Sequence, residues 1–358
     1  MDFTFTPEQD EAAALAAEIL RDLTTPERQR AADQTRFDAD LWQSLASSGL
    51  LSLAVPEEYD GAGLGLLELC RVVIEAGRTV APVPIGVHGA CRLLIAELGT
   101  PQQKEQALRS QTGIVTAAVA EDHAAQPLTP ATTATPSGDG YRIDGLKAVV
   151  PAGTIAEQLL VTATTPTGVG VFLVDPSDPG VTVTPQTLTG GELAARIEFA
   201  DVPASVLTDS VQRLHDVLTV VACAEQLGVT EGALALTASY AREREQFDRP
   251  IGTFQAVSQR LADGYIDTLM QRLTLWQAAW RLAEGLPAAT EVAVAKLWAA
   301  DAGYRIAHTT VHVHGGVGID LDGVAHRYFT TAKRFELRYG GSTEQALAVG
   351  RVLASEPA

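Results

Sequence analysis

Cysteine and methionine are scarce in this sequence, with three and two residues among 358. Cys70, Cys91 and Cys223 stand among apolar neighbours with no paired spacing. We therefore expect buried thiols, and neither a disulfide framework nor a metal site. Such thiols fit a reducing compartment, so the predicted location is cytoplasmic. The N-terminus has no basic stretch followed by an apolar core, and no signal peptide is expected.

Positive charge is also in deficit, because 26 basic residues face 44 acidic ones and leave a net charge of −18. A chain this negative repels nucleic acid and anionic membrane surfaces, so neither is an expected partner. We find no apolar run that approaches membrane-spanning length. Any anionic cofactor must then be held by a locally positive site. The length and the 46% hydrophobic content allow two or three domains with a substantial core.

Helical signals dominate up to about residue 112. Thr6-Pro-Glu-Gln9 and Thr100-Pro-Gln-Gln103 are capping boxes that predict two helix starts. Another helix is expected to begin after Phe37 and to end at Ser48-Gly49. The glycine-rich stretch 56–65 lacks a P-loop lysine and a preceding strand, so we interpret it as a connector between helices.

Between Gly113 and about Pro203 the pattern changes to short β-branched runs separated by turn residues such as Ser137-Gly-Asp-Gly140. This pattern predicts a small β barrel or sandwich. Helical periodicity returns from Val211 to Ala354. The predicted fold is α+β, with a helical domain over 1–112, a β domain over 113–205 and a helical bundle over 206–358.

One stretch of the C-terminal region, 240–259, combines groups suited to an anion. The helix that begins near Val211 is expected to break at Pro250 and to restart by Phe254. A kinked junction would bring a guanidinium and amides together with an aromatic and apolar floor. A surface arginine beside a loop is an alternative that the spacing does not exclude. The residues concerned are Arg244, Gln246, Phe247, Ile251 and Gln255.

The motif R-x-Q-F-x-x-P-I-x-x-F-Q resembles the flavin-contacting segment of acyl-CoA dehydrogenases. A second stretch, His312-Val-His-Gly-Gly-Val-Gly-Ile-Asp320, resembles a block that in this family approaches the FAD of a neighbouring subunit, with His312 where a glutamine is usual. The order helical, β, helical agrees with the family over essentially the whole chain. The resemblance implies FAD as cofactor. The cofactor-binding residues that it implies are Arg244, Gln246, Phe247, Ile251, Phe254, Gln255, His312, Gly315 and Gly316.

The sequence departs from the family where the flavin ring is held. Residues 118–127 lack the family's Gly-Ser pair, and in 147–153 the tryptophan and the threonine of the family motif are replaced by Val149 and Pro151. Proline has no N–H to donate, and valine offers no π face. We therefore expect that this β domain no longer binds the flavin ring.

The family's catalytic base is missing as well. Dehydrogenation needs a carboxylate that removes the α-proton while hydride leaves for the flavin. The two family positions for this glutamate correspond to Gly340 and to a site on or near Leu218. Asp216 is the nearest acid to Leu218, but it is rotated to another face of the helix. We expect no catalytic residue on this chain.

Three histidines near the C-terminus could suggest a metal site. His308 and His312 share a helix face, but no third ligand follows at zinc-type spacing, and His314 is expected to point elsewhere. We predict no bound metal.

A chain that has half of a cofactor site and no catalytic base is expected to be one subunit of a heteromeric enzyme. It resembles the small, base-lacking subunit of actinobacterial heterotetrameric (α2β2) steroid side-chain acyl-CoA dehydrogenases. That resemblance implies FAD-dependent α,β-dehydrogenation of a steroid-carboxyl-CoA thioester in cholesterol catabolism. A homologous partner would supply the glutamate and most acyl-CoA contacts, and electrons would pass to an electron-transfer acceptor. A structural subunit without cofactor contacts and an autonomous homotetramer with an unconventional base are the alternatives. The stretches that carry the resemblance are 25–29, 36–42, 246–252, 261–267 and 311–318.

Overall fold

The computed structural model describes residues 4–355. Within them the chain forms two compact units. The helical unit comprises 4–33, 70–81 and 222–355, and the barrel unit comprises 34–69 and 82–221. The α+β fold predicted from the sequence, helical then β then helical, is confirmed. The proposed domain boundaries at 112 and 205 stay a prediction.

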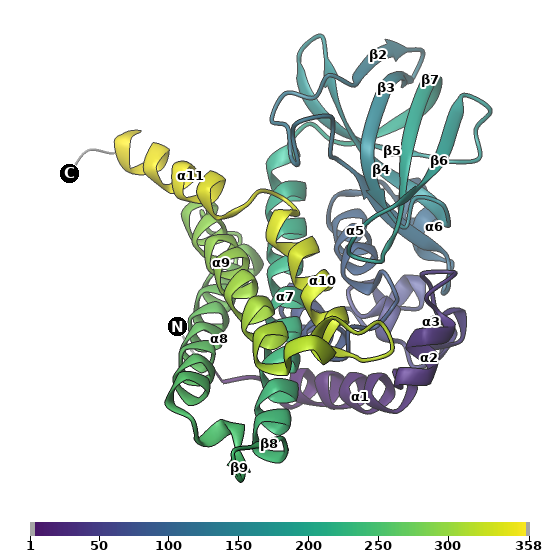
Figure 1. The fold of residues 1–358 in the computed structure, drawn as a ribbon. Coiled ribbons are helices and arrows are strands. Elements are labelled where there is room, and N and C mark those ends of the chain that lie inside the picture. The colour runs from purple at the N-terminus through teal and green to yellow at the C-terminus, as the bar shows by residue number, and fades with distance from the viewer. Residues whose placement is uncertain (1–3, 356–358) are drawn as a thin grey trace. The chain divides into compact units, whose positions relative to one another are not determined.

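The barrel unit is built on one seven-stranded sheet (Figure 1). β4, β2, β3, β7 and β5 are paired in that order, and β5 also pairs with β4, so the sheet closes on itself. Of the two predicted forms, the closed barrel is the one present. Its interior is filled by apolar side chains such as Ile143, Val161, Phe172 and Ile197. The strands are β1 (Ile114–Ala118), β2 (Thr133–Ser137), β3 (Gly140–Pro151), β4 (Ala156–Thr165), β5 (Gly168–Val174), β6 (Val181–Thr187) and β7 (Leu193–Thr208).

Short helices complete the barrel unit. Asp38 caps the helix that the sequence placed after Phe37, and Ser48 and Gly49 end it as expected. Thr100 and Gln103 form the predicted capping box at the start of α6. These helices are α3 (Ala39–Ser47), η1 (Leu50–Ser52), η2 (Glu57–Tyr59), α5 (Ile85–Leu98) and α6 (Pro101–Leu108).

The helical unit contains the C-terminal bundle, in which α9 packs against α8, α10 and α11. Thr6 and Gln9 form the predicted capping box of its first helix. Two helices, α4 (Leu66–Thr79) and α7 (Val211–Glu243), pass from one unit into the other along the chain. The remaining helices are α1 (Pro7–Leu23), α2 (Pro26–Ala31), η3 (Ile251–Thr253), α8 (Gln255–Ala283), α9 (Ala289–His314), η4 (Gly315–Ile319), α10 (Ala325–Leu337) and α11 (Ser342–Ser355).

α7 corrects one expectation about hydrophobic runs. By length and composition this helix is apolar enough to cross a membrane, with a mean hydropathy of 1.3 over its most apolar window. However, 78% of that window is buried inside the protein. Burial of this extent is what the core helix of a folded bundle shows, so the finding is weak support for a membrane span.

Candidate functional site

The break after α7 is a small hairpin rather than a kink. β8 (Glu245–Gln246) pairs with β9 (Arg249–Pro250), and α8 begins soon afterwards at Gln255. The two residues at the tip, Phe247 and Asp248, both have positive φ (55° and 60°), as a type I′ turn requires. The N–H of Ile251 donates to the carbonyl of Arg244 (2.8 Å) and closes the hairpin. The predicted interruption of the helix is present, but α7 ends at Glu243, seven residues before Pro250, and helix restarts at Gln255, one residue after the predicted Phe254.

The hairpin carries its functional groups on the surface. The side chain of Phe247 is 86% exposed, and Arg244 and Gln246 are also exposed. Among the described residues no carboxylate forms an ion pair with Arg244. An exposed aromatic ring and an exposed guanidinium on one hairpin make it a candidate binding surface.

A second arginine, which the sequence reasoning did not select, belongs to the same hairpin. The guanidinium of Arg249 lies 4.2 Å from the centre of the Phe254 ring. The edge of the Phe247 ring meets the same ring, with centroids 6.2 Å apart. The alternation of arginine and phenylalanine over 244–254 was the signal that could have identified it, because guanidinium groups stack on aromatic faces.

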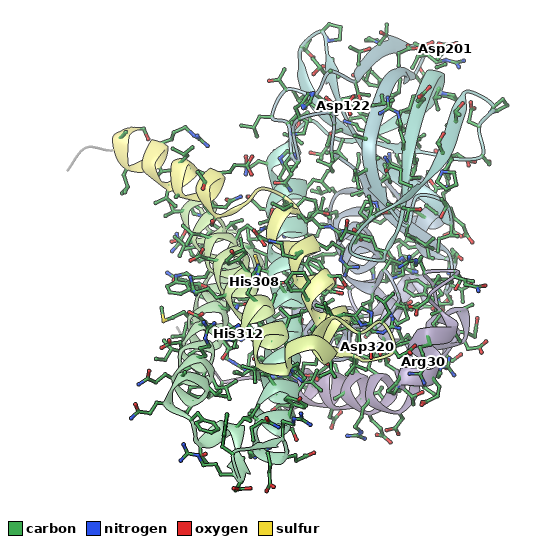
Figure 2. The ribbon with its side chains drawn as sticks, in the orientation of Figure 1. Arg30, Asp122, Asp201, His308, His312 and Asp320 are labelled. Atoms are coloured by element: carbon green, nitrogen blue, oxygen red, sulfur yellow. The ribbon has the colours of Figure 1, made fainter. Side chains whose placement is uncertain are left out.

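The second block lies where α9 ends and η4 begins. His312 is exposed on α9, and Figure 2 shows it along the same helix as His308. Gly315 has φ 65° and ψ −141°, a backbone conformation open essentially to glycine alone. A Cβ added at Gly315 or at Gly316 would meet no atom within 4 Å, so the space beside both glycines is open.

A ring stack connects the two blocks within the helical unit. The imidazole of His314 lies on Tyr240, with centroids 4.3 Å apart and an interplanar angle of 21°. Its Nδ1 is 2.8 Å from the carbonyl oxygen of Thr310. Tyr240 stands in the last turn of α7, directly before the hairpin, so the stack fixes the end of α9 against the base of the hairpin.

The histidines form no metal centre within residues 4–355. His308 packs against the rings of Tyr304 (4.3 Å) and Phe329 (5.3 Å). No group of three histidine, cysteine, aspartate or glutamate side chains with a metal-binding arrangement occurs in this part of the chain.

Gly340 occupies a turn that is built for glycine. Tyr339 and Gly340 both have positive φ, 61° and 93°. A Cβ at Gly340 would lie 2.8 Å from Nε2 of Gln345 and 3.0 Å from Oε2 of Glu344. The same Glu344 carboxylate accepts the N–H of Gly341 (2.7 Å) at the start of α11. The nearest acid to this position is therefore engaged in capping a helix.

The other family position for the base is equally unsuited to proton transfer. Leu218 is 2% exposed, inside the barrel-unit portion of α7. Oδ1 of Asp216 accepts a hydrogen bond from Nε2 of Gln212 (2.8 Å), one turn away on the same helix. Burial raises the pKa of Asp216, while the Gln212 hydrogen bond and Arg213 oppose that rise.

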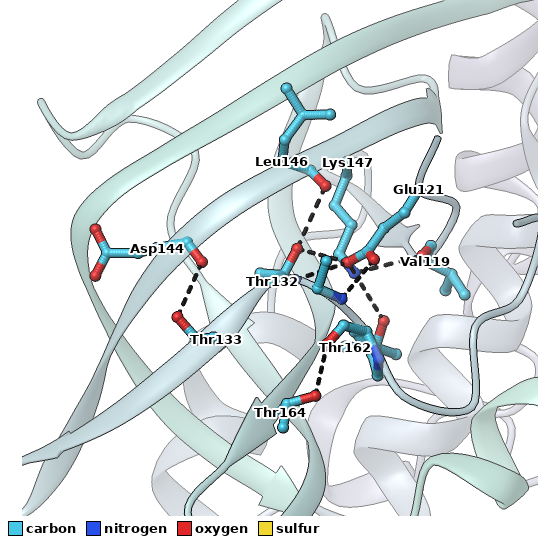
Figure 3. A network of polar contacts seen from close by, with 11 residues as sticks. Val119, Glu121, Thr132, Thr133, Asp144, Leu146, Lys147, Thr162 and Thr164 are labelled. Carbon is cyan, nitrogen blue, oxygen red and sulfur yellow. Dashed lines mark hydrogen bonds and ion pairs between the residues drawn. The ribbon is translucent and has the colours of Figure 1, made fainter. Parts of the chain in front are cut away.

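A buried ion pair organises the segment between β1 and β2 (Figure 3). Nζ of Lys147 on β3 donates to Oε1 of Glu121 (2.8 Å) and to Oγ1 of Thr162 (3.0 Å). The Glu121 carboxylate also accepts from the N–H of Ala131 (2.6 Å) and from Oγ1 of Thr132 (2.7 Å). One carboxylate thus holds both ends of the loop that follows β1.

Burial and pairing act in opposite directions on these two groups. Burial lowers the pKa of Lys147 to about 8, while the hydrogen bond and charge of Glu121 limit the fall. Burial would raise the pKa of Glu121, but hydrogen bonds from Lys147, Thr132 and the Ala131 amide outweigh it and leave that pKa lowered. Both groups are therefore charged near neutral pH.

The two segments that depart from the family motif lie side by side in the barrel unit. The N–H of Ala148 donates to the carbonyl of Ala120 (2.9 Å). Pro151 offers only its carbonyl, which accepts from Oγ1 of Thr116 (2.5 Å). Where the family has its Gly-Ser pair, Nε2 of Gln126 lies 3.3 Å from Oγ1 of Thr219.

The comparisons with known proteins show which family shares this fold. The N-terminal domain model of acyl-CoA dehydrogenases matches residues 6–112, and the C-terminal domain model matches residues 216–353. The chain belongs to the acyl-CoA dehydrogenase family. Members of this family are FAD-dependent oxidoreductases that act on CH–CH bonds.

Three relatives are similar over almost the whole chain. The acyl-CoA dehydrogenase FadE27 of Mycobacterium tuberculosis is 44% identical, with both chains fully covered. A chain of the ChsE4–ChsE5 complex from the same organism is 43% identical with a TM-score of 0.93, again with both chains fully covered. A chain of the Tcur3481–Tcur3483 steroid acyl-CoA dehydrogenase, G363A variant, is 41% identical with a TM-score of 0.93 and covers 97% of this chain and 98% of its own.

Proposed function

We propose that this chain is the base-lacking subunit of a heteromeric, FAD-dependent acyl-CoA dehydrogenase. The enzyme would introduce an α,β double bond into a CoA thioester. Two features of this one chain support the proposal. Both positions for the catalytic glutamate hold residues that cannot accept a proton, Gly340 and Leu218. In contrast, Arg244 remains exposed and unpaired at the hairpin.

The hairpin fits the diphosphate of FAD. Arg244 would hold the phosphates as a two-pronged donor, with Gln246 beside it. His312 would add a donor, and the open space at Gly315 and Gly316 would let the backbone come close to the cofactor. The adenine half would lie against an apolar and aromatic set, which consists of Phe247, Ile251, Phe254 and Gln255. A purely structural subunit would have no need for this arrangement.

The barrel unit does not fit the flavin ring. Val149 and Pro151 supply neither a stacking face nor an N–H, and the Gln126 amide is engaged with Thr219. When FAD is bound, its ring accepts the hydride that leaves the substrate. We infer that the ring, the base and most of the acyl-CoA are held by a homologous partner, and that an electron-transfer acceptor reoxidises the flavin.

The surface of the helical unit supports a partner subunit. Tyr265, Leu269 and Leu273 are exposed on α8 and recur every four residues, so they form one apolar stripe. Leu347 and Leu353 add exposed apolar surface on α11. Unpaired apolar faces of this kind mark interaction surfaces. We propose an α2β2 heterotetramer in the cytoplasm.

The substrate class follows from the relatives rather than from a pocket in this chain. Two solved relatives at more than 40% identity are a two-component complex and a steroid enzyme by their printed descriptions. We therefore propose a steroid side-chain carboxyl-CoA, formed in cholesterol catabolism, as the thioester.

The proposal is tested by expressing the chain alone and together with a homologous subunit that carries the glutamate. Alone, the chain should be colourless or poorly soluble, because half of each FAD site and the apolar faces have no partner. Together, the two chains should purify as a yellow complex in equal amounts. A stable, yellow and active homo-oligomer of this chain alone would contradict the proposal.

A further inference from the structure

A small buried cavity in the barrel unit lies outside the cofactor site. Its walls come from η1 and the residues that follow it, from the start of α4 and from one face of α5. Its free volume is about 10 Å³, which is room for about one small occupant. Leucine, alanine, isoleucine and glycine line this space, and His88 and Arg92 are the two polar residues among its lining.

His88 presents a donor with no acceptor to this cavity. The residue is fully buried, and its Nδ1 accepts the N–H of Val115 on β1 (3.2 Å). Burial and the neighbouring Arg92 charge hold the pKa of His88 well below its usual value, so the ring is neutral and its proton is on Nε2. The carbonyl of Leu51 slightly favours a charged ring, but it does not reach hydrogen-bonding geometry with Nε2, which has no partner in the described chain.

Arg92 presents a second donor and a buried charge. It is 1% exposed and stands one helical turn from His88, on the same face of α5. Its Nη1 donates to the carbonyl of Ser110 (2.8 Å) and its Nη2 to that of Leu108 (2.6 Å), which leaves Nε without a partner. Burial lowers the pKa of Arg92 to about 10, so the guanidinium is charged at neutral pH. No carboxylate in the described chain pairs with it.

We propose that this cavity binds a small monovalent anion, with chloride as the physiological occupant, between Nε2–H of His88 and Nε–H of Arg92. Both unsatisfied atoms are donors, so the occupant must be an acceptor. A water molecule would satisfy them and could donate one hydrogen to the Leu51 carbonyl, but its second hydrogen would face apolar walls. A halide only accepts, and it also neutralises a buried cation that otherwise has no counter-charge.

A bound anion would serve the fold of the barrel unit rather than the redox chemistry. His88 already bonds to β1, and Arg92 already holds the end of α6. An anion shared by the two side chains would connect these elements through α5. Its binding to the folded state alone would stabilise that state in proportion to the logarithm of its concentration.

A crystal structure of the full-length protein grown in bromide tests the site directly. Anomalous scattering should show bromide within reach of both Nε2 of His88 and Nε of Arg92. Density for a water molecule without an anomalous peak would overturn the proposal. This measurement needs no variant, so it does not depend on how a substitution affects folding.

A second test measures unfolding of the full-length protein at constant ionic strength, with chloride replacing gluconate. Above the dissociation constant, the unfolding equilibrium constant of the wild type should fall about tenfold for each tenfold rise in chloride. Arg92→Met should lose this dependence, and so should His88→Phe if Arg92→Met fails to fold. Arg109→Met is the control, because Arg109 is exposed and pairs with Glu105 at the surface. Equal chloride dependence in Arg92→Met and the wild type would refute the site.

Discussion

At the scale of single residues, the proposed cofactor site depends mainly on Arg244. Its guanidinium is exposed and has no carboxylate partner in the described chain, so its charge is available to a ligand. Gln246, by contrast, uses its amide to donate to the carbonyl of Glu245 (2.8 Å). Phosphate binding would therefore depend on Arg244 more than on its neighbours.

Arg244→Ala should remove FAD from the assembled complex. A charge-assisted hydrogen bond contributes about 1.5–3 kcal/mol, so the loss of a two-pronged contact should weaken FAD binding at least about tenfold. The measurement is FAD affinity by flavin fluorescence. Arg242→Ala is the matched control, since Arg242 is an exposed arginine on the last turn of α7. Unchanged affinity in Arg244→Ala would show that the diphosphate is held elsewhere.

Gly340 is the second residue on which the account depends. Its φ of 93° disfavours any residue other than glycine, and a side chain here would also displace the Gln345 amide. Gly340→Glu should therefore lower stability by roughly 1–2 kcal/mol from the backbone conformation alone and should not create a base. Thermal unfolding and dehydrogenase assays of the assembled complex, with the partner's catalytic glutamate replaced by glutamine, measure the two effects. Gly341→Ala, at a glycine with a more open surrounding, should leave stability nearly unchanged. Activity gained by Gly340→Glu in that complex would show that a carboxylate at this position can act as the base.

At the scale of elements, the loop after β1 is held by the ion pair of Glu121 and Lys147, whose side chains are 8% and 0% exposed. Glu121→Gln would leave a buried lysine without its counter-charge, at an expected cost of about 3–5 kcal/mol in unfolding free energy. Denaturant unfolding measures it, with the exposed Glu198→Gln as control. A loss below about 1 kcal/mol would show that Thr162 and the carbonyl groups suffice to hold Lys147.

The same pair predicts a pH dependence of stability. The pKa of Glu121 is lowered in the folded protein, so its contribution is present at neutral pH and is lost as the pH falls through the folded pKa. Between pH 7 and the acid limit of folding, the wild type should lose more stability than Glu121→Gln. Parallel stability curves for the two proteins would contradict this assignment.

The element scale also shows what the sequence could and could not predict. Capping boxes at Thr6 and Thr100 are local signals, and the structure confirms them. Pro250 correctly indicated that the helix is interrupted, but α7 already ends at Glu243 because a hairpin precedes the proline. The hairpin tip could not be predicted, because positive φ at Phe247 and Asp248 follows from the pairing of β8 with β9 and not from residue preference. β2 and β7 carry weak local strand signals, since alanine and proline interrupt their β-branched residues.

Contacts between residues that are distant in the sequence could not be predicted either. Glu121 and Lys147 meet only because β3 pairs in register beside the segment that follows β1. The cavity donors His88 and Arg92 share a helix face in the sequence, but their missing acceptors become visible only when β1 and α6 are in place. For the cofactor site, motif spacing identified the residues, and the structure added Arg249 and the stack of His314 on Tyr240.

At the scale of the whole molecule, the candidate cofactor-binding groups are distributed unevenly between the two units. In the proposed assignment, the diphosphate-binding groups belong to the helical unit, which also exposes an apolar stripe on α8 and apolar side chains on α11. The barrel unit has a closed, well-packed sheet, and we propose that it does not hold the flavin ring. The account therefore requires that the proton of the substrate be removed by a carboxylate of another chain.

The most direct measurement is single-turnover bleaching of the flavin by the CoA thioester in the assembled complex, which isolates proton and hydride removal from product release. Asp216→Asn and Glu344→Gln, the nearest acids of this chain, should each bleach within a few fold of the wild type. Replacing the partner's catalytic glutamate by glutamine should slow bleaching by about 10²–10⁴-fold. A thousandfold slower bleaching in Asp216→Asn or Glu344→Gln, with FAD still bound, would place the base on this chain and contradict the account.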